Sequence, residues 1–362
     1  MKIAFDAKRA LHNTTGLGNY SRQLLLGLKE NFPTNTYDLF SPTTPHDLFQ
    51  NFAQQFPLHY PQGSWKALPA LWRSYQVANE IKADIFHGLS NELPFVKNTR
   101  HKKVVTIHDL IFLKHYEQYP FFDRKIYETK TRWACAHADM VVATSEETKR
   151  DVMQFYKTPE SKIEVVYQGC NADFFEKKTT EEKEQVRRKY ALPQQFILNI
   201  SSFFARKNQT NLIRAFELAA DKIEQDLVLV GNSGNLKSAI KAQIKKSKFR
   251  NRIQLLALDS GDIPTLYQLA SLFVYPSFFE GFGIQLAEAM ASGTPLVASD
   301  IACFREVANA SAVYCNPNSS NDLAEKIMEQ LQQKPTLAVQ AQAAFFSTKN
   351  VAERMMRVYE LL

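Results

Sequence analysis

The strongest structural signal in the chain is the stretch Tyr275-Pro276-Ser277-Phe278-Phe279-Glu280-Gly281-Phe282-Gly283-Ile284-Gln285-Leu286-Ala287-Glu288-Ala289-Met290. The apolar run at residues 272–275 has the length and composition of a buried strand, and residues 296–298 form a second such run. A Gly-Phe-Gly turn joins the first run to a helical pattern that closes at residues 292–295. The stretch therefore predicts a strand, a glycine turn, a helix and a second strand.

The turn has the chemistry of a site for a phosphorylated ligand. Backbone N–H groups are free at a helix N-terminus, where the helix dipole favours negative charge. These amides belong to Gly281, Phe282, Gly283 and Ile284. Because a carboxylate repels phosphate, we expect Glu280 to accept hydrogen bonds from hydroxyl groups beside the phosphate, and Glu288 to reach a second set of hydroxyls. Two hydroxyl-bearing rings joined by a diphosphate describe a nucleotide sugar.

Residues 277–299 resemble the signature of the family-4 retaining glycosyltransferases of GT-B fold, in which two glutamates separated by seven residues bind the donor. The alternative is a structural strand–turn–helix unit with two surface glutamates. The match includes both glutamates, the glycine turn and the tail at residues 289–295, and is more specific than a lone glycine motif. The resemblance implies that Glu280 is catalytic and that residues 281–284 and Glu288 bind the donor.

Length and pattern predict an α/β protein of two domains. At 362 residues the chain exceeds the size at which one core keeps growing. Strands alternate with helices in both halves, which predicts two doubly wound, Rossmann-like domains. The resemblance to GT-B enzymes implies that the two domains face each other across a cleft. We expect an acceptor-binding domain at 1–175, a donor-binding domain at 176–345, and a terminal helix at 346–362. The resemblance implies that this helix crosses back to the first domain.

Composition indicates a cytoplasmic globular protein. The contents of 45% hydrophobic and 22% charged residues are ordinary for this class. No apolar run is long enough to span a bilayer, and the N-terminus reads directly into a strand without a signal peptide. The four cysteines have neither metal-ligand nor disulfide-framework spacing. We therefore expect a reducing compartment and no bound metal or other cofactor.

The net charge of +7 leaves three kinds of partner open, namely nucleic acid, an anionic membrane surface and an anionic substrate. The sequence contains no recognisable nucleic-acid module, so we expect no nucleic-acid partner. The densest group of cations lies at residues 237–252. We favour a solvated helix face there by about two to one over a patch that touches a membrane.

A glycine-containing loop at residues 13–20 is expected between a first strand at 2–5 and a helix at 21–29. The loop contains two glycines but lacks the third glycine of the Gly-x-Gly-x-x-Gly fingerprint of dinucleotide-binding proteins. Its similarity to that fingerprint is therefore weak, which argues against binding of a nicotinamide cofactor. The resemblance implies that this loop lies near the acceptor and opposite the donor diphosphate. Its matching residues are Gly16, Leu17, Gly18 and Tyr20.

Two histidines fall where predicted parallel strands end, which is the usual place for ligands in an open α/β sheet. His87 follows a strand at 84–86, and we weigh a structural and a functional role for it equally. His108 follows the buried strand at 103–107. Residues 106–109 resemble the family segment whose histidine points toward the donor sugar, which implies a catalytic role for His108.

In the second half, Arg206 and Lys207 follow a strand at 196–200. Adjacent cations in such a loop would stabilise a diphosphate and the charge that develops as the sugar leaves. The resemblance strengthens this interpretation and implies that the lysine contacts the donor phosphates. It also places Gly231 and Leu258 in the donor site, the latter in a loop that cradles the nucleobase.

The sequence thus predicts a retaining hexosyltransferase that uses a nucleotide diphosphate sugar, with GDP-mannose the leading donor. The expected acceptor is a glycan or lipid-linked glycan, and peripheral contact with the inner membrane face fits such an acceptor. No carboxylate pair across a sugar ring is evident, and family behaviour implies front-face transfer without a catalytic metal. A nucleotide-sugar epimerase or hydrolase of the same fold and a non-catalytic binding subunit remain alternatives.

Overall fold

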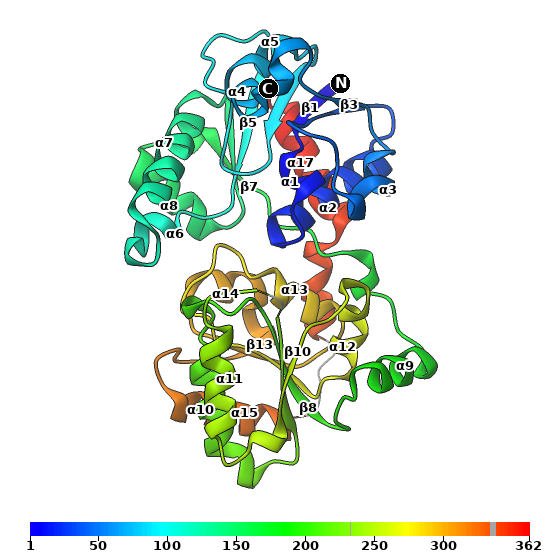
Figure 1. Cartoon of the computed structure of the whole chain (residues 1–362), viewed down its shortest axis with the longest axis vertical. Coiled ribbons are helices and arrows are strands. Elements are labelled where there is room, and N and C mark those ends of the chain that lie inside the picture. The colour runs from blue at the N-terminus through cyan, green and yellow to red at the C-terminus, as the bar shows by residue number, and fades with distance from the viewer. Residues whose placement is uncertain (232, 334–337) are drawn as a thin grey trace. The chain divides into compact units, whose positions relative to one another are not determined.

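The computed structural model describes residues 1–231, 233–333 and 338–362 and divides the chain into two compact units (Figure 1). The first unit combines Met1–Gly169 with Thr348–Leu362, and the second comprises Cys170–Ser347. The chain leaves the first unit before the predicted end at residue 175 and returns to it at Thr348. Each unit contains one parallel sheet with helices, so the predicted pair of Rossmann-like domains is confirmed.

The first unit is built on a seven-stranded sheet in the order β3-β2-β1-β4-β5-β6-β7, with every neighbouring pair parallel. The direction in which strands are added to the sheet reverses between β1 and β4. This is the switch point at which open α/β sheets bind ligands. Its strands are β1 (Lys2–Asp6), β2 (Thr36–Phe40), β3 (Leu58–His59), β4 (Ile85–Gly88), β5 (Lys102–Ile107), β6 (Met140–Ala143) and β7 (Ile163–Val165).

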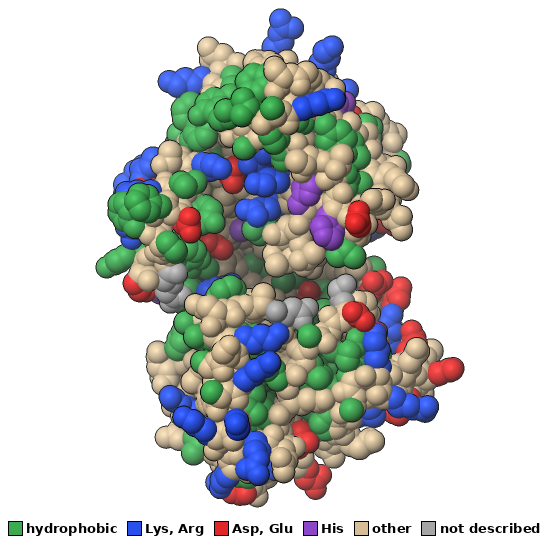
Figure 2. Space-filling view, viewed as in Figure 1, with side chains coloured by type: hydrophobic (Ala, Val, Ile, Leu, Met, Phe, Trp, Pro, Cys, Tyr) green, Lys and Arg blue, Asp and Glu red, His purple; other side chains and the backbone are tan. Residues whose placement is uncertain are grey.

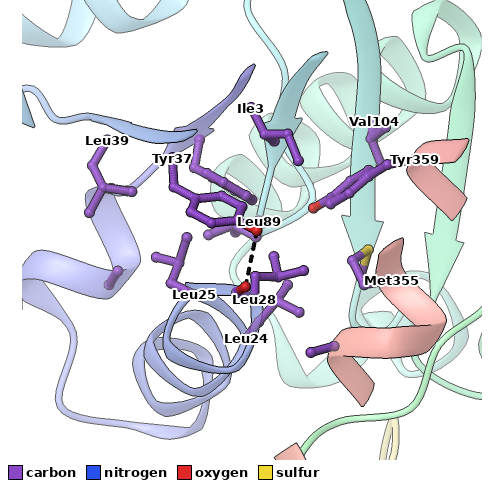
Figure 3. Close-up of a cluster of buried hydrophobic side chains, with 14 of the residues drawn as sticks. Ile3, Leu24, Leu25, Leu28, Tyr37, Leu39, Leu89, Val104, Met355 and Tyr359 are labelled. Atoms are coloured by element: carbon purple, nitrogen blue, oxygen red, sulfur yellow. Dashed lines mark hydrogen bonds between the residues drawn. The ribbon is translucent and has the colours of Figure 1, made fainter. Parts of the chain in front are cut away.

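Helices cover this sheet, and the last of them comes from the C-terminus. They are α1 (Lys8–His12), α2 (Gly16–Asn31), α3 (Gln50–Ala53), α4 (Pro69–Leu71), α5 (Val77–Glu80), α6 (Ile111–Lys114), α7 (Phe121–His137), α8 (Glu146–Tyr156) and α17 (Thr348–Glu360). The red helix α17 packs beside α2 in Figure 1. Its Met355 and Tyr359 join a buried cluster with Leu24 and Leu28 of α2 (Figure 3). The final helix is therefore part of the first unit's core.

The second unit is built on a six-stranded parallel sheet in the order β10-β9-β8-β11-β12-β13. Its strands are β8 (Phe196–Ile200), β9 (Asp226–Val230), β10 (Ile253–Leu256), β11 (Leu272–Tyr275), β12 (Leu296–Ser299) and β13 (Ala312–Cys315). Every residue of β11 and β12 is buried, as expected for continuous apolar strands covered on both faces. Order reverses between β8 and β11, so the loops after these strands lie at the switch point.

The helices of this unit lie between successive strands, as parallel pairing requires, and also before the first strand and after the last. They are α9 (Thr180–Tyr190), α10 (Gln209–Ala219), α11 (Lys237–Lys246), α12 (Ile263–Leu269), α13 (Ile284–Ala291), α14 (Ala302–Ala308), α15 (Ser320–Gln332) and α16 (Ala338–Ala343). The predicted strand, glycine turn, helix and strand of the signature stretch are β11, residues 276–283, α13 and β12.

One local prediction is wrong: residues 16–20 form the first turns of α2 rather than a loop. The Asn13 side-chain oxygen accepts hydrogen bonds from the backbone nitrogens of Thr15 (2.8 Å) and Gly18 (3.3 Å). These bonds satisfy donors that a helix N-terminus leaves free, so the helix can begin five residues earlier than its apolar pattern indicates. The loop itself is confined to residues 13–15.

Candidate functional site

The cations and the first glutamate of the predicted site come from loops that follow the adjacent strands β8 and β11. Arg206 and Lys207 lie in a short 3-10 turn, Ala205–Lys207, and Glu280 lies in the loop before α13. The backbone nitrogen of Phe278 donates to the Arg206 carbonyl over 2.8 Å. This bond ties the two loops together and fixes the positions of the charged side chains.

Glu280 forms an ion pair through each of its carboxylate oxygens. Arg206 Nη1 lies 2.5 Å from Oε2, and Lys207 Nζ lies 2.5 Å from Oε1. The side chains of Glu280 and Lys207 are only 8% and 6% exposed, so these charges are poorly screened by water. Burial opposes ionisation of Glu280, but Arg206 and Lys207 outweigh it and lower its pKa to about 2. Burial also lowers the pKa of Lys207, to about 8, although Glu280 opposes that shift. The site therefore holds a carboxylate beside two cations.

Tyr275, which no sequence motif marks as functional, connects these charges through its hydroxyl group. Lys207 Nζ donates to the hydroxyl oxygen over 2.7 Å, and the hydroxyl lies 3.1 Å from Glu280 Oε1 and 3.0 Å from Gln285 Oε1. Its ring is fully buried at the end of β11 and stacks on Phe304. Only the polar residue type at the end of an apolar strand could have signalled this role, because Lys207 is distant in sequence and the turn that brings Glu280 back to the hydroxyl is not visible in the sequence.

The turn before α13 depends on a left-handed glycine. Gly283 has φ of +89°, and a Cβ atom there would lie 2.6 Å from Cε1 of Phe304. Glycine is therefore required both by conformation and by space. Phe282 is buried, with its ring against Phe346, and Ile284 begins the helix. The structure gives Phe282 a packing role, and its predicted contact with a donor would have to be made by the backbone.

Glu288 lies in α13 and differs from Glu280 in its electrostatics. The Tyr267 hydroxyl donates to Glu288 Oε2 over 3.2 Å, and no ion pair involves this carboxyl among the described residues. Burial raises the pKa of Glu288 to about 7, which the bond from Tyr267 only partly offsets. The two signature glutamates thus have different protonation behaviour near neutral pH.

The remaining donor-site predictions fall in neighbouring loops of the same unit. Gly231 follows β9, and a Cβ atom there would lie 2.3 Å from the carbonyl oxygen of Ser201, so the chain after β9 passes close to the chain after β8. Leu258 follows β10 and is buried. Both lie beyond carboxyl ends of strands, as a ligand site at this edge requires. Their contact with a donor stays a prediction.

In the first unit, His108 follows β5 and lines a cavity of about 200 Å³. Its Nε2 lies 2.9 Å from the carbonyl oxygen of Leu89. A carbonyl only accepts, so Nε2 carries the proton and Nδ1 keeps its lone pair, 3.5 Å from Nε2 of Gln168. Burial lowers the pKa of His108 to about 4, so the ring is neutral at pH 7. The remaining lining includes Arg9, Glu92, Asp109 and Lys130.

The four predicted residues near the start of α2 have different surroundings. Leu17 lines the same cavity as His108. Gly16 has open space around it, whereas a Cβ atom on Gly18 would overlap the Asn13 carbonyl. Tyr20 is buried, contacts the His108 ring edge-on and bonds to Thr106 over 3.0 Å. Tyr20 therefore supports the histidine from inside the core.

His87 belongs to the core of the first unit. Its two ring nitrogens lie 2.7 Å from the Tyr359 hydroxyl and 2.8 Å from the Thr106 hydroxyl. The ring is fully buried, and burial lowers its pKa to about 3. Of the two roles weighed for His87, the structure favours the structural one, since this ring links β4 and β5 to α17.

Within residues 1–231, 233–333 and 338–362, no group of three or more His, Cys, Asp or Glu side chains is arranged to hold a metal ion. The expectation that catalysis needs no metal stays a prediction. Over the same residues, no helix combines the length and apolarity that a bilayer crossing needs.

Two family models match consecutive parts of the chain. Residues 14–174 match the model described as Glycosyltransferase Family 4, and residues 181–345 match Glycosyl transferases group 1. The first lies within the unit that carries His108, apart from its last few residues, and the second lies within the unit that carries Arg206 and Glu280.

Several curated proteins and solved structures are similar over most or all of the chain. The O-antigen chain mannosyltransferase B of Escherichia coli is 25% identical over an alignment of 392 positions that covers 100% of both chains. The O-antigen chain mannosyltransferase RfbU of Salmonella typhimurium is 27% identical, covering 73% of this chain and 72% of its own. A glycosyltransferase from Rickettsia africae has a TM-score of 0.78 at 22% identity, covering 99% of this chain and 97% of its own. Anabaena Alr3699/HepE in complex with UDP-glucose has a TM-score of 0.77 at 20% identity over 100% of both chains.

Proposed function

The chain belongs to the family-4 glycosyltransferases of GT-B fold, and from that premise we propose that it is a retaining hexosyltransferase. It transfers a sugar from a nucleotide diphosphate to a glycan or lipid-linked glycan acceptor. The observation that supports this most strongly is the cluster of buried Lys207 and Glu280 with partly exposed Arg206, beside the glycine turn of α13. Mannose from GDP-mannose is the leading donor, because two similar curated proteins are named as mannosyltransferases.

In this proposal the cations of the second unit stabilise the leaving group. Arg206 and Lys207 hold the diphosphate, whose negative charge grows as the bond to the sugar breaks. Glu280 and the amides of residues 281–284 hold the sugar and the phosphates. Glu288 accepts hydrogen bonds from the ribose hydroxyls. The ion pairs to Glu280 position both cations before a donor arrives, which reduces the reorganisation needed in the transition state.

His108 acts by orientation, because its ring is neutral. With Nε2 donating to the Leu89 carbonyl, the Nδ1 lone pair, which Gln168 Nε2 approaches only to 3.5 Å, is proposed to accept a hydrogen bond from a hydroxyl group of the donor sugar in place of Gln168. A neutral ring adds no positive charge beside the oxocarbenium character that develops during transfer. His108 thus selects the sugar by a hydrogen bond.

The transfer itself is proposed to occur on one face of the sugar. The bond from the anomeric carbon to the diphosphate oxygen breaks, and the acceptor hydroxyl oxygen forms the new bond on the same face. The departing phosphate oxygen takes the acceptor proton, so charge and atoms balance without a second carboxylate. The cytoplasm and the inner membrane face are the proposed place of the reaction.

Transfer of mannose from GDP-mannose to an oligomannose acceptor tests this function, with the anomeric configuration of the product read by proton NMR. The α-mannoside is expected, with GDP released in equal amount. A β-product would contradict the retaining mechanism. Release of free mannose at the same rate with and without an acceptor would favour a hydrolase.

A further inference from the structure

Asn91 has a left-handed backbone conformation in a loop that ends no helix. Among the described residues, five non-glycine residues have a positive φ, and Asn91 is one of them, with φ of +57°. The other four each follow directly on a helix or 3-10 turn, where such a residue commonly ends the helix, and they are Lys157, Ala191, Asn208 and Asn309. Asn91 instead follows β4. Because such conformations cost free energy and gather at functional sites, the one at Asn91 points to a local role.

The side-chain amide of Asn91 brackets the backbone of residues 108 and 109. Its Oδ1 accepts a hydrogen bond from the backbone nitrogen of His108 over 2.9 Å, and its Nδ2 donates to the carbonyl oxygen of Asp109 over 3.2 Å. An N–H group only donates and a carbonyl only accepts, so these two partners fix the orientation of the amide. The backbone nitrogen of Asn91 donates to the Thr106 carbonyl over 2.9 Å. Asn91 thus joins the loop after β4 to the end of β5 through three hydrogen bonds.

The same loop also orients the ring of His108. The carbonyl oxygen of Leu89, two residues before Asn91, accepts the hydrogen bond from Nε2 over 2.9 Å, and Leu89 is buried. The Tyr20 ring contacts the imidazole edge-on, with ring centroids 4.7 Å apart. The Thr144 hydroxyl donates to the His108 carbonyl over 2.8 Å. The loop after β4 therefore supplies the partners of the His108 backbone nitrogen and of its ring.

The surroundings of His108 offer competing partners to its ring. Figure 2 shows basic, acidic and histidine side chains gathered on one face of the first unit. The cavity that His108 and Asn91 line has the same mixed character, because Arg9, Glu92 and Lys130 line it as well. An imidazole ring can donate or accept through either nitrogen, so charged neighbours of both signs favour different tautomers. A single ring state therefore depends on fixed anchors, which the loop after β4 supplies.

We propose that Asn91 is a positioning residue for His108. By holding the backbone of residues 108 and 109, it keeps the ring where Nε2 donates to the Leu89 carbonyl and Nδ1 carries the lone pair. Both polar atoms of the Asn91 side chain have protein partners, so Asn91 acts through the histidine. The hydrogen bonds compensate for its left-handed backbone. The inference rests on the proposed function only in taking His108 as the residue that accepts a hydroxyl group of the donor sugar.

Asn91→Gly removes the amide and leaves the backbone conformation available, because glycine adopts a positive φ without strain. Nitrogen-15 NMR of the imidazole groups reports the tautomer of His108, whose signals are identified by their absence from His108→Gln. We expect the native chain to show one neutral tautomer at pH 7, with the proton on Nε2. We expect Asn91→Gly to show a mixture of both tautomers, because the ring is no longer held against the Leu89 carbonyl.

Kinetics of mannose transfer from GDP-mannose give the second readout. A misplaced His108 weakens an interaction with the sugar in the transition state, so kcat is expected to fall by about tenfold or more in Asn91→Gly. The KM for the donor should change by less than about twofold, because the proposed phosphate and ribose contacts lie in the second unit. Thermal unfolding verifies that each variant is folded at the assay temperature.

Asn309→Gly is the matched control. Asn309 also has a positive φ, of +47°, and is exposed at the end of α14 in the second unit. This variant gains the same backbone freedom and should keep the native His108 tautomer and kcat. Equal losses in both variants would overturn the proposal.

A measurement on the native chain guards against a variant that fails to fold. The backbone amide of His108 should exchange its hydrogen slowly with solvent, because Asn91 Oδ1 accepts that hydrogen. Rapid exchange at this amide would overturn the proposal without any substitution.

The two readouts of Asn91→Gly decide between positioning and other roles. An unchanged His108 spectrum would overturn the proposal even if kcat fell, because Asn91 would then act on the substrate directly. A changed spectrum with native kcat would also overturn it, because the held ring would not serve transfer. The spectra need no substrate, so they separate this inference from the proposed function. If the native chain transfers no sugar while the tautomers respond as expected, the proposed function is wrong and Asn91 still positions His108.

Discussion

At the scale of single residues, the Tyr275 hydroxyl holds Lys207 against Glu280. A buried ammonium group is stable only when its N–H donors find acceptors, and this hydroxyl supplies one of them. Removing this hydroxyl leaves the Lys207 ammonium group with one hydrogen-bond acceptor fewer and allows its side chain to move more freely. The hydroxyl should therefore matter for turnover although it need not touch the substrate.

Tyr275→Phe keeps the ring stacked on Phe304 and removes only the hydroxyl. A hydrogen bond to a charged group is worth roughly 1.5–3 kcal/mol, so kcat/KM should fall by about tenfold or more. The basic limb of the pH–rate profile should also move to lower pH, because the Lys207 ammonium loses an acceptor. Steady-state kinetics across pH measure both effects.

Tyr37→Phe is the matched control for that variant. Its hydroxyl lies 3.0 Å from the carbonyl oxygen of Leu28 (Figure 3) and 2.9 Å from that of Phe32, in the core of the first unit. Removing it should lower stability without moving the pH profile. An unchanged profile in Tyr275→Phe would assign its hydroxyl to packing alone.

Glu288 predicts a pH dependence of donor binding. Because burial raises its pKa to about 7, the carboxyl is largely protonated below that pH and ionised above it. The ionised form accepts hydroxyl hydrogen bonds more strongly, so donor affinity should rise between about pH 6 and pH 7, below the range in which Lys207, with its pKa of about 8, loses its charge. Calorimetric titrations should show this rise in the native chain and a flatter dependence in Glu288→Gln.

The same residue predicts the opposite trend for stability. A carboxyl whose folded pKa exceeds its ordinary value of 4.5 destabilises the fold once it ionises, so the native chain loses stability as pH rises from about 4.5 through about 7. Glu288→Gln removes that loss. Its free energy of unfolding relative to the native chain should therefore increase over this range, and a constant difference would show that Glu288 titrates normally.

At the scale of elements, two glycines at the start of α2 differ in what surrounds them. Gly16 has open space around its Cα, whereas a Cβ atom on Gly18 would lie 1.8 Å from the carbonyl oxygen of Asn13. Both were predicted in one loop, but both lie in the first turns of the helix. The close approach at Gly18 explains a glycine where helix propensity disfavours one.

Alanine substitutions separate these two positions. Gly16→Ala should be neutral or stabilise the chain by up to about 1 kcal/mol, because alanine loses less backbone entropy in a helix. Gly18→Ala should destabilise by about 1–3 kcal/mol, because backbone must move to admit the methyl group. Urea unfolding measures both, and equal effects would contradict the close approach of the Asn13 carbonyl to Gly18.

For the proposed donor site, the secondary-structure elements could be predicted from the sequence better than the side-chain contacts. Apolar strands such as residues 272–275 and the glycine turn have local signals, so β11, the turn and α13 could be predicted. The network of Tyr275 and Tyr267 could not, because each hydroxyl bonds to residues that only folding brings near. The start of α2 was missed because its N-terminal donors are satisfied by Asn13, a bond that apolar periodicity does not reveal.

At the scale of the whole molecule, the chain leaves the first unit at Gly169 and returns for its last helix. Six residues of α17 are fully or almost fully buried against that unit, and Tyr359 bonds to His87. The first unit is thus incomplete until the C-terminus has been made. Folding of the first 169 residues alone should leave this core open.

Met355→Ala tests that dependence. Met355 is fully buried in the cluster that joins α17 to α2, and truncating it should cost about 2–5 kcal/mol. Hydrogen exchange should lose protection in β1, β4 and α2, with the second unit unchanged. Arg357→Ala, at an exposed position of the same helix, is the control and should change neither unit. Equal loss of protection in both units would contradict separate cores.

The most direct test of the central claim is calorimetric titration of GDP-mannose into the native chain and into Lys207→Ala, with UDP-glucose as a second donor. We expect one nucleotide sugar to bind the native chain and its Kd to rise by at least about tenfold in Lys207→Ala, since a buried cation that pairs with phosphate is lost. Lys222→Ala, at an exposed lysine of the same unit, should bind as the native chain does. If neither donor binds the native chain, or if Lys207→Ala binds equally well, the buried cations do not form the donor site and the account is wrong.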